Sequence, residues 1–160
     1  PYRNVVGIWM NRIMQGLPCT IFGDGTQTRA FTHVSDVAPL IAASVDCPQA
    51  RGQVFNIGSD VPYSLNVLAR MVQDAMGRDT GIEYAPARDE VAHAFSDHEK
   101  CRRVFGYEPK MPLADGLSRM ARWAKEAGVR RNWHVKHVEI ARDLPASWTS
   151  VCSTAKDSAS

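Results

Sequence analysis

Residues 19–34 read "CTIFGDGTQTRAFTHV", and this stretch indicates how the surrounding chain folds. The segment 19–22 is short and apolar enough for a buried strand, and it runs directly into the turn 23–25, which has two glycines around an aspartate. Residues 30–34 form a second extended segment. Between them stands one guanidinium, that of Arg29. We interpret the stretch as a strand, a ligand-facing turn and a return segment.

Helices are predicted on both sides of this stretch. Apolar residues cluster between positions 5 and 17 as on one broad helical face, and Gly16 with Pro18 ends that helix. After the return segment, Ser35 and Asp36 are N-cap candidates for the next helix. That helix carries the following residues on one face: Val37, Leu40, Ile41, Ser44 and Val45.

The rest of the chain continues the alternation of strands and helices. "QVFNIG" (53–58) and 82–86 are predicted strands, separated by a helix over 63–77 with Ser64 as cap and Gly77 as stop. Ser96 and Glu99 have the spacing of a capping box. The helix they open buries three residues before Gly106: Cys101, Val104 and Phe105.

A last predicted helix has Pro112 at its first position and ends at Gly128. Beyond it, 133–140 is either a strand or an irregular arm, and 146–160 is expected to be a flexible tail. Strands that alternate with helices predict an α/β fold.

The composition is that of one ordinary globular domain. The chain has 160 residues, of which 44% are hydrophobic and 22% charged. A net charge of +2 favours neither nucleic acid nor a membrane surface as a partner. The four cysteines are widely spaced, so neither a disulfide scaffold nor a zinc site is expected, and the cytoplasm is the default location. The chain begins with Pro1 and carries no signal peptide, so we expect a piece of a longer protein or a processed product.

Four segments in order carry a family resemblance: "IFGDGTQTRAF", "HVSDVA", "QVFNIGS", and "SDHEKCRRVFGYEP" with the helix after it. Together they resemble the C-terminal half of an NAD-dependent nucleotide-sugar epimerase/dehydratase of the extended short-chain dehydrogenase/reductase family, most like the UDP-glucose 4-epimerases. The resemblance covers 1–145. It implies the C-terminal part of a Rossmann-like parallel sheet, with 53–58 as a late strand, plus a small α/β substrate-binding domain. Taken alone, this would be an incomplete fold.

The resemblance also implies a site for a UDP-sugar. A pyrophosphate must be desolvated and oriented, and two arginines from different loops do this well. The matching residues here are Arg29 and Arg88, with Gln27 as a further polar ligand. In the family, the backbone and the aromatic side chain of the preceding strand hold the uracil, and this strand corresponds to Thr20, Ile21 and Phe22. The second arginine of the family usually belongs to an R-x-G-E element. This chain instead has "RDEV" at 88–91, which is one residue shorter and lacks the glycine.

The parts that would bind NAD and carry out the reaction are not recognisable in this sequence. The 11 glycines nowhere form GxxGxxG or GxGxxG, and no tyrosine is followed by lysine four residues on. We therefore assign no catalytic and no cofactor-binding residue. NAD is expected in the full-length parent, and this chain alone is expected to bind none. A homodimer of the parent is possible.

Two classes of function stay open. The chain is either the substrate-binding portion of an NAD-dependent enzyme or a non-catalytic protein that binds sugar nucleotides and lacks the NAD-binding half. His134 and His137 have a metal-like spacing, but no third ligand is evident in the sequence, and we predict no metal site.

Overall fold

The fold is taken from a computed structural model that describes residues 4–129. Its elements, in chain order, are α1 (Val5–Met14), β1 (Cys19–Phe22), β2 (Thr28–Ala30), α2 (Val34–Ala43), two short 3₁₀ turns (Ser44–Asp46 and Pro48–Ala50), β3 (Pro62–Ser64), α3 (Leu65–Met76), β4 (Ile82–Ala85), β5 (His93–Ala94), α4 (Glu99–Phe105) and α5 (Leu113–Ala127). The predicted arm and tail, at 133–140 and 146–160, lie outside the described residues.

One hydrophobic core holds α1, α3 and α5 against β1. Helix α1 contributes Trp9, Met10 and Ile13, and α3 contributes Leu68 and Val72, all essentially inaccessible to solvent. Helix α1 ends three residues earlier than predicted, because the chain turns at Gly16 (φ 77°). The Leu17 amide then donates back to the carbonyl of Arg12. The helical period of apolar residues in the sequence therefore located this core correctly.

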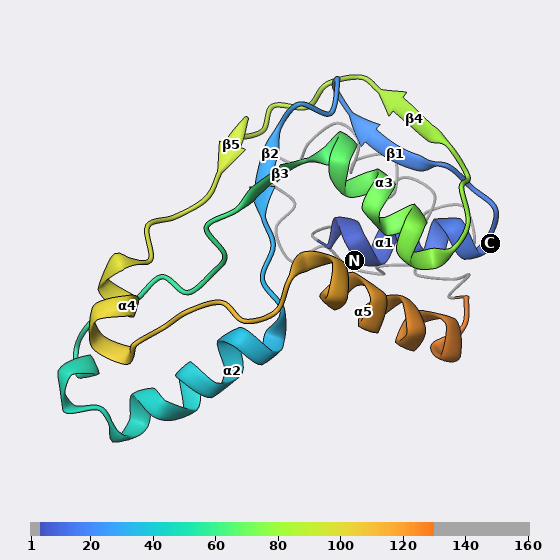
Figure 1. The fold of residues 1–160 in the computed structure, drawn as a ribbon. Helices are drawn as coiled ribbons and strands as arrows, with labels where there is room; N and C mark the ends of the chain where they lie inside the picture. The colour runs from blue at the N-terminus through green and yellow to red at the C-terminus, as the bar shows by residue number, and fades with distance from the viewer. Residues whose placement is uncertain (1–3, 130–160) are drawn as a thin grey trace, which may run out of the picture. The chain divides into compact units, whose positions relative to one another are not determined.

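Strands β1 and β4 form a parallel pair, as Figure 1 shows, and both were predicted. Their register places Cys19 opposite Ile82 and Phe22 opposite Ala85. Cys19 is fully buried, and this burial raises the pKa of its thiol to about 11. Parallel strands joined through a helix confirm the α/β class.

A second sheet has the strand order β3-β2-β5. Strand β2 is antiparallel to β3 and parallel to β5. The predicted extended segment 30–34 is misplaced, since β2 covers Thr28–Ala30 and α2 begins at Val34. Strands of two or three residues are too short to show a period in the sequence. Their positions are therefore set by hydrogen bonds to segments that are distant in the chain.

Helix α3 begins and ends where its sequence indicates. The Ser64 hydroxyl accepts a hydrogen bond from the Val67 amide at 3.2 Å, which is the predicted cap. Gly77 stops the helix in the left-handed conformation (φ 64°).

The predicted strand over 53–58 is wrong for the described residues. This segment pairs with no strand there, and Val54 is 82% exposed. Its polar groups are bound by side chains, because Lys100 donates to the Val54 carbonyl at 2.9 Å and Tyr107 to the Gly58 carbonyl at 3.0 Å. A strand forms only beside a partner, and the apolar alternation of this segment does not supply one.

Helix α2 also departs from its prediction. Its N-cap is His33, whose Nδ1 accepts from the Ser35 amide at 3.2 Å, so neither Ser35 nor Asp36 is the cap. None of its residues is buried, and Ile41 is 60% exposed. The apolar face predicted here is only partly covered by the described residues, because Val37, Leu40 and Ser44 are half-buried while Ile41 and Val45 are exposed.

Helices α4 and α5 are present with altered starts. Ser96 and Glu99 form no capping box, because the Ser96 hydroxyl contacts His98 and the Glu99 amide donates to the Asp97 carboxylate at 2.7 Å. Cys101 is fully buried, as predicted for α4. Pro112 precedes α5 as its N-cap residue.

Candidate functional site

The turn after β1 is fixed by its own side chains. Gly23 and Gly25 have φ values of 79° and 77°, where residues with a Cβ are strained. Between them, Asp24 accepts hydrogen bonds from the hydroxyl of Thr26 at 2.7 Å and from its amide at 2.9 Å. The bond from the Thr26 hydroxyl, and after it the bond from the Thr26 amide, lowers the pKa of the Asp24 carboxyl. The turn is therefore a defined loop.

The start of α3 holds this turn in place. The Asn66 amide donates to the Gly25 carbonyl at 3.1 Å, and its side-chain Nδ2 donates to the Asp24 carbonyl at 2.9 Å. Tyr84, on β4, donates in turn to Asn66 Oδ1 at 2.9 Å. Segments far apart in the sequence thus fix one loop, and they position the residues that follow it.

Arg29 lies on β2, directly after this loop, and its guanidinium is half-buried. Its Nη1 donates to the carbonyls of Thr28 at 2.8 Å and Ala92 at 3.2 Å. Its Nη2 pairs with the Glu90 carboxylate at 3.2 Å. The side chain is 24% exposed, so the guanidinium is held by protein atoms and still reaches solvent.

Gln27 lies beside the same carboxylate. Its Nε2 donates to the Phe22 carbonyl at 2.7 Å and to Glu90 Oε1 at 3.1 Å. The residue is only 9% exposed. Glu90 therefore bridges an amide donor and a guanidinium, and each of its oxygens accepts one bond.

Arg88 contacts the aromatic ring of Phe22. Its guanidinium carbon is 3.1 Å from the centre of the Phe22 ring, a stacked cation–π contact. Arg88 thereby covers the aromatic ring to which the sequence assigns a base-binding role. A base would have to share or replace that contact.

Thr20 and Ile21 point elsewhere. The Thr20 hydroxyl donates to Glu83 at 3.4 Å, and the Thr20 carbonyl accepts from the Trp9 indole at 2.9 Å. The Ile21 side chain is fully buried in the core. The side chains of Thr20 and Ile21 are therefore engaged within the protein.

Four of the six predicted residues therefore meet through one chain of contacts. It runs from Arg88 to Phe22, then through Gln27 and Glu90 to Arg29. Glu90 is the member that the sequence did not assign to the site. The shortened R-D-E motif was the available signal, since it places a carboxylate two residues after Arg88.

A second polar network lies beneath α4. Buried His98 contacts Asp60 through Nδ1 at 2.7 Å and the Ser96 hydroxyl through Nε2 at 3.0 Å. Arg102 pairs with the other oxygen of Asp60. A Cβ on Gly58 would come within 2.9 Å of His98 Nε2, so glycine is needed for this packing. The network ties α4 to residues 58–60.

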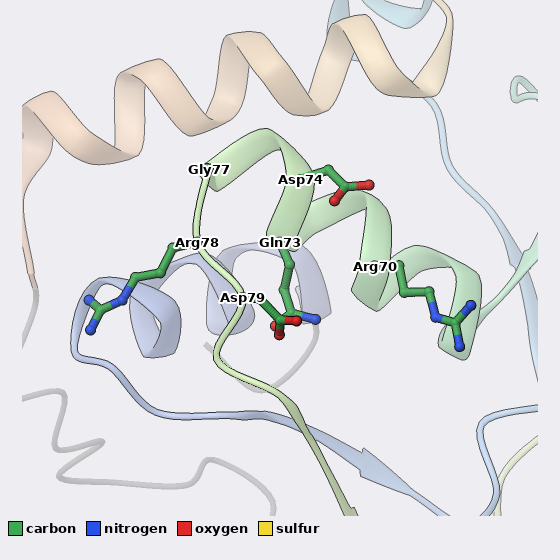
Figure 2. Close-up of a pocket in the computed structure, with 6 residues that line it drawn as sticks. All are labelled: Arg70, Gln73, Asp74, Gly77, Arg78 and Asp79. Atoms are coloured by element: carbon green, nitrogen blue, oxygen red, sulfur yellow. The ribbon is translucent and has the colours of Figure 1, made fainter.

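The pocket at the end of α3, drawn in Figure 2, is separate from these residues. Its volume is about 560 Å³, and its lining is Arg70, Gln73, Asp74, Gly77, Arg78 and Asp79. Figure 2 shows the guanidinium groups of Arg70 and Arg78 pointing away from each other. Arg78 donates to the Ile13 carbonyl, and Gln73 accepts from the Thr80 amide. These contacts fasten the α3–β4 turn, so they do not converge on a ligand.

A more apolar pocket of about 500 Å³ lies between α5 and the junction of β2 with α2. Its lining includes Phe31, Leu113, Met120 and Trp123. None of the six predicted site residues lines either pocket.

Neither a cluster of metal-ligating side chains nor a glycine just before a helix is found among the described residues. Residues 4–129 contain no cluster of three or more His, Cys, Asp or Glu side chains that could hold a metal ion. No described helix starts from a glycine, because the residues before the five helices are Asn4, His33, Ser64, His98 and Pro112. A glycine-rich turn at a helix start is the usual seat of a dinucleotide pyrophosphate. Within the same part of the chain, every helix is too short or too polar to cross a bilayer.

Comparison with known proteins finds a matching family and similar sequences among nucleotide-sugar enzymes. A sequence model of the NAD dependent epimerase/dehydratase family matches residues 2–58. The UDP-glucose 4-epimerase of Mycolicibacterium smegmatis is 31% identical over 116 residues, which are 72% of this chain and 37% of that protein. A UDP-N-acetyl-alpha-D-glucosaminuronate decarboxylase of Bacillus cytotoxicus is 27% identical over 133 residues, covering 79% of this chain and 41% of the relative.

Solved structures agree with the fold. The UDP-glucose 4-epimerase of Thermotoga maritima, determined with UDP-glucose, superimposes with a TM-score of 0.72 at 29% identity, over 78% of this chain and 40% of that one. The α/β fold is thus that of part of a Rossmann-like epimerase. The chain spans about two fifths of the length of these proteins.

Proposed function

We propose that this chain is the substrate-binding portion of an NAD-dependent nucleotide-sugar epimerase or dehydratase, and that its ligand is a UDP-sugar. The observation that carries the proposal is the chain of contacts that joins Arg88, Phe22, Gln27 and Arg29 at the end of β1. The matching family model and relatives that act on UDP-sugars support the same ligand class.

The pyrophosphate is the chemical reason for this arrangement. Its two negative charges need donors that are already oriented when the ligand arrives. Arg29 meets this need, because two backbone carbonyls hold its Nη1 while Nη2 faces the half-exposed carboxylate of Glu90. Arg88 supplies a second cation from another loop, and stacking on Phe22 limits its movement.

In the whole protein, we assign the reaction to UDP-glucose/UDP-galactose 4-epimerisation. The resemblance of the "GDGTQTR" segment to that group supports this choice, as does the 31% identity to a UDP-glucose 4-epimerase. We infer that NAD is held outside this chain, because no glycine fingerprint is recognisable in its sequence. This chain contributes binding and orientation of the nucleotide, and it supplies no recognisable acid or base for the reaction.

The uncovered apolar surface is consistent with such a division of labour. Helix α2 buries none of its residues, and Val34 and Ile41 on it are exposed. Val45 and Val54 nearby in the sequence are exposed as well. Exposed apolar surface of this kind is typical of an interface, and the NAD-binding half of the parent would cover it.

Titration of UDP into the 160-residue chain tests the proposal. We expect Arg29→Ala to weaken UDP binding about ten- to a hundredfold, because a hydrogen bond to a charged group contributes roughly 1.5–3 kcal/mol. Arg29→Lys should restore part of this loss, since a point charge replaces a two-pronged contact. The measurement is the dissociation constant from isothermal titration calorimetry.

Arg122→Ala is the matched control, because it removes the same charge from an exposed position on α5. We expect it to change UDP affinity less than twofold, as is usual for a remote surface charge. Equal losses for Arg29→Ala and Arg122→Ala would contradict the proposed site. Absence of UDP binding by the unmodified chain would contradict the proposed ligand.

A further inference from the structure

We propose that Glu90 is a built-in competitor of the ligand: its carboxylate occupies the anion position between Arg29 and Gln27, and a phosphate group displaces it. This inference rests on the proposed function, and it adds a residue that sets the affinity of the same site. The family resemblance does not imply a competitor at this position. The inference is drawn from the hydrogen bonds of Glu90 in the described structure.

The two oxygens of Glu90 make the contacts expected of a phosphate. One accepts from Arg29 Nη2 at 3.2 Å, and the other accepts from Gln27 Nε2 at 3.1 Å. A guanidinium and an amide that converge on one anion are a phosphate-binding arrangement. Glu90 therefore lies where the ligand has to bind, and both cannot use these donors at once.

The donors keep their positions without Glu90. Arg29 Nη1 is held by the carbonyls of Thr28 and Ala92, and Gln27 Nε2 also donates to the Phe22 carbonyl. Departure of Glu90 would leave one donor of the nearly buried Gln27 unpaired, which is unfavourable until another acceptor arrives. A phosphate oxygen is such an acceptor. The site is thus prepared for an anion and temporarily filled by one.

Glu90 is also placed to move. It belongs to residues 86–92, which form neither helix nor strand between β4 and β5. Its side chain is 40% exposed, so its ion pair with Arg29 is screened by water and weak. A doubly charged pyrophosphate interacts more strongly with the same guanidinium than one exposed carboxylate does. Displacement is therefore favourable, and it lowers the apparent affinity by the strength of the pair that is broken.

The test compares Glu90→Gln with Asp89→Asn in the 160-residue chain. Both variants remove one negative charge, and Asp89 is the exposed neighbour that makes neither of the two bonds. The probes are UDP and inorganic pyrophosphate, titrated separately by calorimetry. We expect Glu90→Gln to tighten binding of both probes by the same factor, about two- to fivefold, which corresponds to the loss of an exposed ion pair.

The control and the two probes distinguish the alternatives. Asp89→Asn, which breaks neither bond, should leave both affinities within about 1.5-fold of those of the unmodified chain. An equal gain for both variants would mean a general charge effect and would overturn the inference. Weaker UDP binding by Glu90→Gln, with unchanged pyrophosphate binding, would mean that Glu90 contacts the nucleoside and would also overturn it. In both cases the proposed function stands. If UDP binds neither the unmodified chain nor the variants, the proposed function fails, and this inference fails with it.

Discussion

At the scale of the residue, Gly25 shows why the loop after β1 has this sequence. Its φ of 77° is unfavourable for any residue with a Cβ, and a Cβ there would lie 2.2 Å from Asn66 Oδ1. The same Asn66 bonds to the carbonyls of Asp24 and Gly25. The glycine therefore allows the loop to approach α3 closely, and this approach places Gln27 and Arg29.

Replacement of this glycine should open the loop locally. In Gly25→Ala we expect the amides of Leu65 and Asn66, which donate to the carbonyls of Gln27 and Gly25, to exchange with solvent at least about tenfold faster. A left-handed alanine costs roughly 1–2 kcal/mol, and the contact with Asn66 adds to it. Hydrogen–deuterium exchange followed by mass spectrometry measures the effect.

Gly52→Ala is the control for this change. Gly52 has a φ of 63°, but a Cβ there would meet no atom within 4 Å. Alanine at this position therefore carries the backbone cost without the clash with Asn66, so the two amides should exchange as in the unmodified chain. Similar acceleration in both variants would mean that close packing against Asn66 is unimportant.

At the scale of the element, α2 and α3 differ in what holds them. Helix α3 buries Leu68, Val72 and Met76 in the core, whereas α2 buries nothing. Helix α2 also contains Pro39, which removes one backbone donor from its interior. A short helix with few tertiary contacts is marginal in water, and α2 is tied to the described chain mainly by the bond from the Met111 amide to Asp36. The core and the α2 region should therefore differ in stability.

Exchange of backbone amides will measure that difference. We expect the amides of α2 to exchange at least about a hundredfold faster than those of α3, which corresponds to roughly 3 kcal/mol of local stability. Peptides from residues 34–43 and 65–76 report the two helices in one experiment. Comparable protection of both would show that α2 is covered in solution, for instance by another copy of the chain.

At the scale of the whole molecule, the chain combines a well-formed loop after β1, where we propose nucleotide binding, with no recognisable reaction machinery. The loop residues are fixed by α3 and β4, while the sequence contains no Tyr-x-x-x-Lys pair and no glycine fingerprint. Binding and chemistry are therefore expected to separate in this protein.

The chain alone should not convert its proposed substrate. Incubated with added NAD and either UDP-glucose or UDP-galactose, it should give no interconversion above a blank without protein. The products are measured by chromatography of the sugar nucleotides, with a complete UDP-glucose 4-epimerase as positive control. Interconversion that purifies with the chain would refute the assignment of no catalytic residue.

The sequence by itself determined the elements that carry a strong local signal. The helical period of α1, α3 and α5, the serine cap of α3, its glycine stop, and the strands β1 and β4 all follow from residues that are near neighbours in the chain. The Gly-Asp-Gly turn that precedes Gln27 and Arg29 was also predicted, because it is a local feature. Each of these depends on propensity or spacing, which the sequence contains directly.

Tertiary structure decided whatever depends on a distant partner. Residues 53–58 have a strand pattern but no described strand beside them, so Lys100 and Tyr107 bind their carbonyls instead. Glu90 joined the site because β5 pairs with β2 and brings residues 90–94 to Arg29. Hydrogen bonds between residues some sixty positions apart, such as those of Arg29 with Glu90 and Ala92, leave no pattern in the local sequence. They form only when folding brings the two strands together.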